Sequence, residues 1–476
     1  MAIKSKNSGA YADIVGVSVK TAGTYAAVQG IYAKSGGVYG SVYSSGPVLP
    51  QSANIVFNMR ADSLALADGV TVSSWTDSSA NALAFTGTGT FKTNQLGTKP
   101  CVRFSGAAGQ YMTATRAGTA LNTAMSSQIC TVMIVGKSLG TNSLGTMFGS
   151  HAGGNNCFFV IDGAQTSSAI GRYANNTNFC APAVNASNMF VSAVSSVIPY
   201  TAGSGTGLER QYLNGTCVSS NVAGSPVPNQ TTFAIAAASA GSLRAAVDIF
   251  DIVVWDRTLT PTEVFQATDY FYEKYSQTKP WASVSNITVF DGDSITVGVG
   301  SNTGVVGSYP YKSAQSLGLA YGQWTNVAVG GITMANMIAK LSEWNGIGTL
   351  LGKGMRVAAF EYYNQRGNGA TAIQTQNNLY ATTVRGYANT KLALGTSTSH
   401  TGDPDATRAS VNGYYDINFA TYSDAYVPIH NDANIGISGA AATDANVTYF
   451  SDGVHLKPAG YTVLAGLFTT GLSAIP

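Results

Sequence analysis

The hydrophobic pattern of this chain changes its period near residue 280, and that change constrains the fold more than any other feature. Before Gln277–Pro280, apolar and polar residues alternate in short runs such as Ile129–Val135 and Ala246–Trp255, separated by Gly, Asn and Ser turns. Such runs are typical of β-strands. Farther on, short apolar segments alternate with helical patterns, which favours a parallel sheet covered on both faces. The sequence therefore predicts a multidomain chain, with an all-β sandwich over residues 47–280 and an α/β domain over residues 281–476.

The elements expected in the α/β domain follow one another in alternating order. The predicted strands are Ile287–Phe290, Met355–Phe360, Lys391–Leu394 and Tyr426–Ile429. The predicted helices are Tyr311–Leu319, Met334–Trp344, Gln374–Ala388, Ala406–Ala420 and Pro458–Leu472. Ligands of such sheets collect at the carboxyl ends of the strands. Polar residues directly after these strands are therefore the candidate site residues.

The first 46 residues repeat every 14 positions, with Gly-x-Tyr at Gly9–Tyr11, Gly23–Tyr25 and Gly37–Tyr39. Each unit predicts one or two short strands, and a unit of this size cannot bury a core alone. We interpret residues 1–46 as an attachment module, with a flexible arm as the alternative. The repeats resemble Gly-aromatic repeats of phage tail and baseplate proteins. This resemblance implies contacts with other tail or baseplate proteins, a place in the virion tail and a homo-oligomer, with a trimer favoured.

Composition excludes several classes of function. Charged residues make up 10% of the chain and the net charge is +2, whereas nucleic-acid binding requires clustered Lys and Arg. We find neither a long apolar run for membrane insertion nor a signal peptide, so we expect synthesis in a host cytoplasm. The five Cys are widely spaced, which favours free thiols on strands over disulfides or zinc. The many uncharged polar residues suit hydroxyl-rich partners such as sugars.

The segment before residue 280 resembles concanavalin-like, laminin-G-like jelly rolls. Three stretches carry the resemblance, namely Val72–Asp77, Lys99–Gly106 and Val254–Glu263, the last leading into a helix that ends near Lys274–Tyr275. Jelly rolls of this type bind glycans or act as spacers, and both remain open here. Trp75 and Trp255 are candidates for stacking on sugar rings, although buried tryptophans are commoner in sandwiches.

Two polar clusters at opposite ends of the α/β segment suggest nucleophilic catalysis. Ser294 follows the first predicted strand directly, in the sequence Asp291-Gly292-Asp293-Ser294. Asp452 and His455 lie three residues apart before the last helix, so the carboxylate can hold the imidazole and leave its other nitrogen facing a hydroxyl. This is the arrangement that a Ser nucleophile needs.

Two further residues follow strands where a donor could face the reacting oxygen. Gly331 ends the run Asn326–Gly331, where a glycine lets the backbone approach a ligand. Asn364 follows the strand ending at Phe360 and carries an amide, a neutral donor suited to a developing oxyanion. Taken alone, either residue could simply belong to a turn.

Together, Gly292-Asp293-Ser294, Gly331, Asn364 and Asp452-x-x-His455 resemble in order the four blocks of the SGNH (GDSL-type) esterase/lipase hydrolases. The resemblance implies a flavodoxin-like α/β/α fold with Ser294 as nucleophile, His455 as general base and Asp452 as its orienting acid. It also implies an oxyanion hole made by the backbone N–H groups of Ser294 and Gly331 and by the Asn364 amide. The third block departs from Gly-x-Asn-Asp, because this chain reads Tyr362-Tyr363-Asn364-Gln365.

These patterns predict a serine esterase that removes acyl groups, acetyl foremost, from a host cell-surface polysaccharide. No metal and no organic cofactor is expected. The histidines His151, His400 and His430 lack neighbouring carboxylate or thiol ligands at metal spacings, and His430 is read as a surface or rim residue. A non-catalytic receptor-binding tail protein is the alternative, favoured by the unusual third block. A lipase or a peptidoglycan-modifying enzyme is a third possibility.

Overall fold

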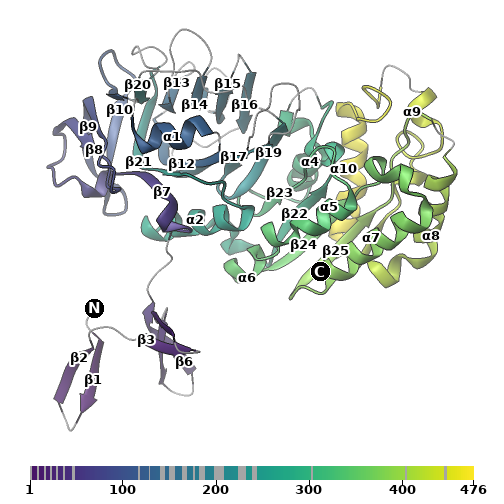
Figure 1. Ribbon diagram of the computed structural model, residues 1–476, viewed down its shortest axis with the longest axis horizontal. Coiled ribbons are helices and arrows are strands. Elements are labelled where there is room, and N and C mark those ends of the chain that lie inside the picture. The colour runs from purple at the N-terminus through teal and green to yellow at the C-terminus, as the bar shows by residue number, and fades with distance from the viewer. Residues whose placement is uncertain are drawn as a thin grey trace.

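The structure is a computed structural model. It describes residues 49–115, 118–127, 129–139, 145–149, 188–197, 208–222, 232–237, 244–301, 304–402, 405–443 and 448–475, and the backbone of strands before residue 45 and between residues 156 and 181. Its main body consists of a large antiparallel sheet followed by a separate parallel sheet with helices (Figure 1). The side chains of His151, Cys157 and Cys180 lie outside those described.

The repeats before residue 45 form three antiparallel hairpins. Their strands are β1 Ile3–Asn7, β2 Ala10–Ile14, β3 Ser18–Thr21, β4 Thr24–Ala27, β5 Gly30–Ser35 and β6 Val38–Ser44. Each hairpin pairs a Lys on its first strand with a Tyr on its second, as Lys6 with Tyr11, Lys20 with Tyr25 and Lys34 with Tyr39. Each 14-residue repeat therefore forms one hairpin, and the three hairpins pair their Lys and Tyr residues in the same register.

The large sheet is antiparallel throughout, apart from an isolated parallel bridge outside its strand pairs. Its strands are β7 Ile55–Arg60, β8 Thr71–Thr76, β9 Ala84–Leu96, β10 Lys99–Ser105, β11 Met112–Thr115, β12 Ile129–Ser138, β13 Gly145–Gly149, β14 Asn156–Asp162, β15 Ala169–Ala174, β16 Thr177–Ala181, β17 Phe190–Val197, β18 Leu208–Leu213, β19 Thr216–Val222, β20 Thr232–Ile235 and β21 Ala246–Trp255. Two helices belong to this part, α1 Ala120–Ser127 and α2 Pro261–Lys274.

This sheet curls over its own core. Its hydrogen-bonded path runs β16-β15-β14-β13-β20-β11-β9-β10-β21-β12-β17-β18-β19, with β7 added beside β21. Phe57 of β7 nevertheless stacks on Phe148 of β13, with ring centroids 5.8 Å apart. Because four strands lie between β13 and β21 in the path, this contact requires the sheet to fold back on itself. The predicted sandwich is thus one continuous curved sheet around a core.

Strand β21 is buried along its whole length because both of its faces are covered. Ile252 and Val254 point into the core of the curled sheet. Val253 and Trp255, on the other face, join a second cluster that includes α2 and the parallel sheet. Helix α2 begins with a capping box between Thr260 and Glu263 and ends at Lys274, as the sequence predicted.

The parallel sheet has the strand order β23-β22-β24-β25-β26, which is 2-1-3-4-5 in chain order. Its strands are β22 Asn286–Gly292, β23 Trp324–Asn326, β24 Gly354–Phe360, β25 Thr390–Gly395 and β26 Ala425–Val427. The helices are α3 Ser294–Val297, α4 Tyr309–Ser316, α5 Met334–Lys340, α6 Ile347–Leu351, α7 Ala370–Arg385, α8 Ala406–Tyr422, α9 Ala440–Thr443 and α10 Pro458–Ser473.

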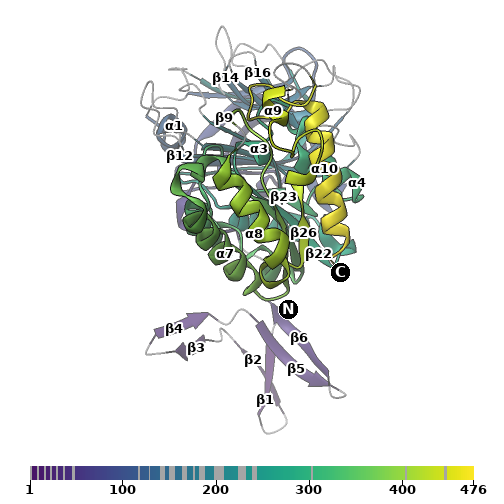
Figure 2. The same cartoon turned by 90° about the vertical axis from the view of Figure 1, so that its right-hand side faces the viewer.

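Helices cover both faces of this sheet (Figure 2). On β24, Val357 packs in the cluster that contains α7 and α8, whereas Phe360 packs in the cluster that contains α4 and α10. The predicted helix Met334–Trp344 ends as an α-helix at Lys340 and continues as a 3-10 turn, Leu341–Glu343. Helix α6 was not predicted from the sequence.

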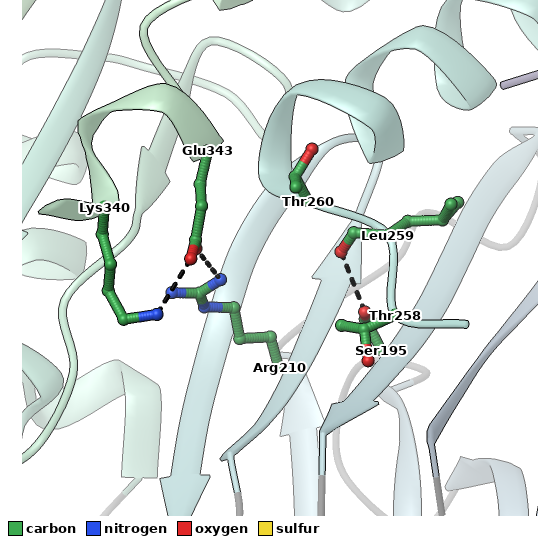
Figure 3. A pocket seen from close by; sticks show the side chains of 7 residues that line it. All are labelled: Ser195, Arg210, Thr258, Leu259, Thr260, Lys340 and Glu343. Atoms are coloured by element: carbon green, nitrogen blue, oxygen red, sulfur yellow. Dashed lines mark hydrogen bonds and ion pairs between the residues drawn. The ribbon is translucent and has the colours of Figure 1, made fainter. Parts of the chain in front are cut away.

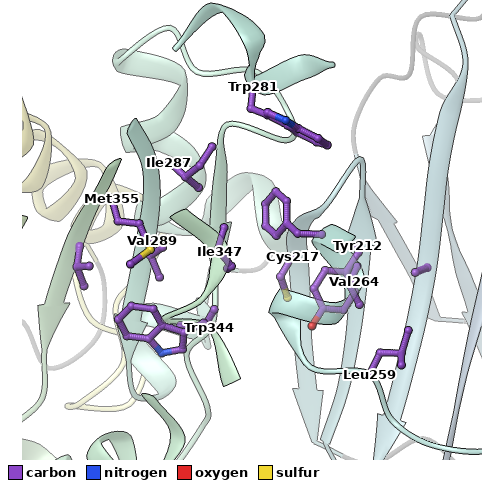
Figure 4. Packing of buried hydrophobic residues seen from close by; sticks show 14 of the residues in the cluster. Tyr212, Cys217, Leu259, Val264, Trp281, Ile287, Val289, Trp344, Ile347 and Met355 are labelled. Carbon is purple, nitrogen blue, oxygen red and sulfur yellow. The ribbon is translucent and has the colours of Figure 1, made fainter. Parts of the chain in front are cut away.

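The two parts pack directly against each other. Thr216 of β19 donates its hydroxyl to the Trp324 carbonyl at 2.6 Å, and the Thr325 hydroxyl accepts from the Cys217 backbone at 3.0 Å. Figure 4 shows Tyr212 and Cys217 across from Ile347 and Trp344 in this packing. One cluster of buried side chains therefore crosses residue 280. The boundary predicted there marks a change of architecture rather than a gap in packing.

Candidate active site

The candidate nucleophile lies where β22, the first strand of the parallel sheet in chain order, ends. Strand β22 ends at Gly292, and Ser294 is the first residue of the short helix α3. The Asp293 carboxylate caps this helix by accepting the Ile295 backbone N–H at 2.9 Å. A Cβ at Gly292 would lie 2.8 Å from the Phe360 carbonyl oxygen and would also collide with the Thr296 side chain. The turn that presents Ser294 therefore requires glycine at position 292.

The structure brings His455 to this serine from 161 residues away. His455 Nε2 lies 2.9 Å from Ser294 Oγ, and His455 Nδ1 lies 2.7 Å from Asp452 Oδ2. The loop that carries them is closed at its base, where Ser451 donates its backbone N–H to the His455 carbonyl at 2.8 Å. It is also tied to the neighbouring loop, because Thr401 donates its backbone N–H to the Gly453 carbonyl at 2.7 Å.

Asp452 is well placed to hold the imidazole in one orientation. Its Oδ1 accepts the backbone N–H groups of Val454 and His455, at 3.1 and 2.8 Å, while Oδ2 faces Nδ1. Partial burial alone would raise the pKa of Asp452, but the hydrogen bonds from His455 and Val454 lower it below its ordinary value. The carboxylate is therefore charged at neutral pH and favours a proton on Nδ1. Nε2 is then free to accept a proton from Ser294.

Two backbone donors lie open at the same edge of the sheet. The Val329 N–H donates to the Gly292 carbonyl at 3.0 Å, which holds the 329–331 turn beside the end of β22. Gly331 is exposed and has a φ of +74°, a conformation that favours glycine. Within the part of the chain that the structure describes, the N–H groups of Ser294 and Gly331 have no hydrogen-bond partner.

Asn364 lies at the site, but its amide already has two acceptors. Its Nδ2 donates to Asp293 Oδ2 at 3.2 Å and to the Ile332 carbonyl at 3.1 Å. Its backbone N–H donates to Glu361 Oε1 at 2.8 Å. The structure thus places Asn364 between two carboxylates, and the amide would have to release one partner in order to face an oxyanion.

The two carboxylates behind Ser294 are buried. Burial raises the pKa of Asp293 to about 6, although hydrogen bonds from the Ile295 backbone and the nearby His455 oppose the shift. Burial also raises the pKa of Glu361 to about 8, and the neighbouring Asp293 raises it further. Glu361 therefore carries a proton at neutral pH. Sequence reasoning did not single out Glu361, because nothing in its local sequence shows that it lies beneath the nucleophile.

A small hollow beside Ser294 is lined in part by His400, for which the sequence indicated no role. Its cavity volume is only about 10 Å³, and its lining includes Asp293, Tyr362, Tyr363 and His400. His400 Nε2 lies 3.3 Å from Asp405 Oδ2, and Tyr362 donates its hydroxyl to the same carboxylate. The sequence did not single out this pairing of His400 with a carboxylate. Asp405 caps helix α8 and reaches His400 through a loop rather than at a motif spacing.

Other side chains considered as ligand contacts have structural partners instead. Trp75 and Trp255 are fully buried and donate to the Arg60 and Pro50 carbonyls, at 3.2 and 2.8 Å, so neither stacks on a sugar. His430 lies on the rim of β26, 2.9 Å from the Thr396 hydroxyl, as the sequence suggested.

Three further findings concern the described residues alone. Cys101, Cys130 and Cys217 are buried on strands and are not joined by a disulfide among these residues. Among these residues, no group of three or more His, Cys, Asp or Glu is arranged to hold a metal ion. None of the helices described combines the length and the apolar character needed to cross a bilayer.

Comparisons with known proteins give only partial likenesses. No family model matches the sequence, and no curated protein matches it either. Among solved structures, a Trypanosoma rangeli sialidase is 14% identical with a TM-score of 0.33, covering 52% of this chain and 35% of its own. TesA is 17% identical with a TM-score of 0.31, covering 39% of this chain and 98% of its own.

Domain 4 of AbnA, an extracellular arabinanase from Geobacillus stearothermophilus, is 14% identical with a TM-score of 0.33, covering 45% of this chain and 98% of its own. The match to the sialidases covers only part of those longer proteins: this chain spans about a third of the length of the sialidase chains that it matches. The roles of the site residues therefore rest on their own geometry.

Proposed function

We propose that this chain is a serine esterase of the SGNH type, with a flavodoxin-like α/β/α hydrolase domain. The observation that carries the proposal is the relay from Asp452 through His455 to Ser294, with contacts of 2.7 and 2.9 Å. Ser294 attacks the ester carbonyl while His455 takes its proton. The alcohol leaves with a proton from His455, and water activated by His455 then hydrolyses the acyl-enzyme.

The developing oxyanion forms beside the open N–H groups of Ser294 and Gly331. One such donor is typically worth about 3 kcal/mol in the transition state. In this proposal Asn364 contributes a third donor once its amide leaves the Ile332 carbonyl, to which it is bound at 3.1 Å.

We further propose that the substrate is an acylated polysaccharide of a host cell surface and that acetyl is the group removed. The proposed setting is a phage tail fibre or tailspike, with residues 1–46 as its attachment module. Support for the setting comes from the repeated hairpins and their constant Lys–Tyr register. The curled β-domain serves as spacer or glycan-binding module.

The decisive experiment for the chemistry is hydrolysis of p-nitrophenyl acetate by the full chain. We expect turnover that Ser294→Ala abolishes, whereas Ser410→Ala, an exposed serine on α8, leaves it unchanged. Mass spectrometry of candidate polysaccharides before and after treatment then identifies the acyl group from the mass lost per site. Absence of turnover on acetylated glycans and on the synthetic ester would refute the proposal.

The setting has its own test. Light scattering of the full chain should give a trimer, and deletion of residues 1–46 should abolish incorporation into tails while leaving esterase activity intact. A chain that enters tails equally well without these residues contradicts the attachment role.

A non-catalytic receptor-binding protein is the second candidate, and one observation favours it. Both donors of the Asn364 amide are engaged, with Asp293 and with Ile332. If this arrangement persists when substrate binds, the oxyanion hole has only backbone donors. Glycan binding by the full chain without any acyl release would support this reading.

A further inference from the structure

A pocket between the two parts of the chain is not used by the proposed mechanism. Its lining comes from both parts: Ser195, Arg210, Thr258, Leu259 and Thr260 from the β-domain, and Lys340 and Glu343 from the α/β domain (Figure 3). Its cavity volume is about 200 Å³, below the range of about 300–1,000 Å³ that is usual for drug-sized ligands, so its ligand must be small.

The charges that line this pocket do not cancel. Arg210 Nη1 donates to Glu343 Oε2 at 3.0 Å, and Lys340 Nζ donates to Glu343 Oε1 at 2.8 Å. Burial would raise the pKa of Glu343, but Arg210 and Lys340 lower it below its ordinary value, so the carboxylate is charged. Two cations therefore share one anion, which leaves one net positive charge.

Arg210 also has a donor without a partner. Its side chain is only 6% exposed, and its Nη2 donates to the Val327 carbonyl at 3.3 Å, yet its Nε is buried without a hydrogen bond. This Nε is buried, so a ligand in the pocket meets Arg210 through the charge of its guanidinium group rather than through this donor. Lys340 is 39% exposed and uses one of its three N–H bonds for Glu343, so it can donate to a ligand directly.

Two other carboxylates of the described residues lie near this charge. Glu263, three residues after the pocket residue Thr260, is paired with Arg257 at 2.9 Å. Asp291 interacts with Arg210, but burial raises the pKa of Asp291 to about 7, so it offsets the charge only in part. The remaining lining combines the hydroxyl side chains of Ser195, Thr258 and Thr260 with the apolar Leu259. Hydroxyl groups beside an apolar surface suit a sugar ring, and the positive charge suits an acidic group on it.

The pocket is also linked to the candidate active site by one short helix. Helix α5 begins at Met334, shortly after Gly331, and ends at Lys340 in the pocket. Seven residues of helix span about 10 Å, so the two ends of α5 lie within the length of one polysaccharide chain.

We infer that this pocket binds an acidic sugar residue, one that carries a single carboxylate or sulfate group, through Arg210 and Lys340. The choice of a sugar rests on the proposed function, whereas the choice of an anion rests on the pocket alone. Binding here would hold an acidic polysaccharide across the junction while a neighbouring acylated unit occupies the candidate active site.

The test is calorimetric titration of full-length Ser294→Ala with glucuronate, glucose 6-sulfate, glucose and inorganic sulfate. Using the variant without the nucleophile separates this proposal from the esterase proposal, because binding here does not require turnover. We expect at least one acidic sugar to bind at least tenfold more tightly than glucose and more tightly than inorganic sulfate. Which of the two acidic sugars binds identifies the acidic group.

Lys340→Gln, made in the same background, should weaken that binding at least tenfold. Lys391→Gln is the matched control, because Lys391 is also a partly exposed lysine paired with a carboxylate, Asp424, but lies outside the pocket. The ligand should also protect Lys340 from acetylation by a water-soluble reagent, as read by mass spectrometry. Equal affinity for glucose and both acidic sugars, or unchanged binding by Lys340→Gln, would overturn the proposal.

Discussion

Replacing Asp452 with Asn tests how His455 is held against Ser294. In the structure, Asp452 Oδ1 accepts two backbone N–H groups of its own loop, and Oδ2 faces His455 Nδ1 at 2.7 Å. An Asn amide has only one oxygen. If that oxygen serves the backbone N–H groups, the NH₂ group faces Nδ1 and forces the ring proton onto Nε2. His455 then presents a donor to Ser294 instead of an acceptor.

The size of the effect follows from comparing Asn with Ala at this position. Asp452→Ala removes a hydrogen bond to a charged group, worth about 1.5–3 kcal/mol, or roughly 10- to 150-fold in rate. The ring stays free to choose its tautomer, because the Asp452 side chain is 53% exposed and water can replace it. Asp452→Asn suffers the same loss and also imposes the wrong tautomer, so we expect a fall in kcat of about 10³- to 10⁴-fold.

The assay is kcat for p-nitrophenyl acetate of the wild type and both variants, with KM measured separately. The expected order is wild type, then Ala, then Asn, with KM nearly unchanged because Asp452 does not touch the substrate. An Asn variant within tenfold of the wild type, or an Ala variant much slower than the Asn variant, would show that Asp452 does not set the tautomer.

Two further predictions concern stability. Glu361→Gln should flatten the pH dependence of the free energy of unfolding. Because the native pKa of Glu361 is raised to about 8, the wild type should lose up to about 5 kcal/mol of stability as the pH rises from about 4.5 to 8. Chemical unfolding of both proteins across that pH range tests this. Arg210→Ala should destabilise the chain by about 1.5–3 kcal/mol, because Glu343 loses its buried partner and keeps only the partly exposed Lys340, whereas Arg210→Met combined with Glu343→Leu should cost much less. Equal losses in the single and double variants would contradict the second prediction.

The alternation of strands and helices after residue 280 could be predicted because each element carries its own periodicity. The predicted Met355–Phe360 agrees with β24 to within one residue, and the predicted start of the last helix at Pro458 agrees with α10. Strand β23 has only three residues, too few for a pattern of its own. The curling of the large sheet also could not be predicted from the sequence. The contact between Phe57 and Phe148 depends on how the whole sheet curves and not on the residues next to either phenylalanine.

In the candidate site, too, local motifs indicate some residues, whereas the roles of others depend on contacts made only in the folded chain. Ser294, Asp452 and His455 could be identified because each belongs to a short motif, and their meeting follows from where strands end in a parallel sheet. The partners of Asn364 could not be identified, since its amide binds Asp293 from another strand end. Arg210 was missed for a similar reason: a basic residue in an ordinary strand meets Glu343 only after both parts have folded together.

The contact between β19 and β23 bears on how the chain avoids aggregation. Strand β23 is the outermost strand on its side of the parallel sheet, and unpaired edges of this kind template association between molecules. Here Thr216 and Cys217 occupy that edge with hydrogen bonds to Trp324 and Thr325. A fragment released by cleavage near residue 280 would lose this cover together with its apolar surroundings. We therefore expect the α/β half to depend on its neighbour to stay free of aggregation, which gives the β-domain a protective role whether or not it binds a glycan.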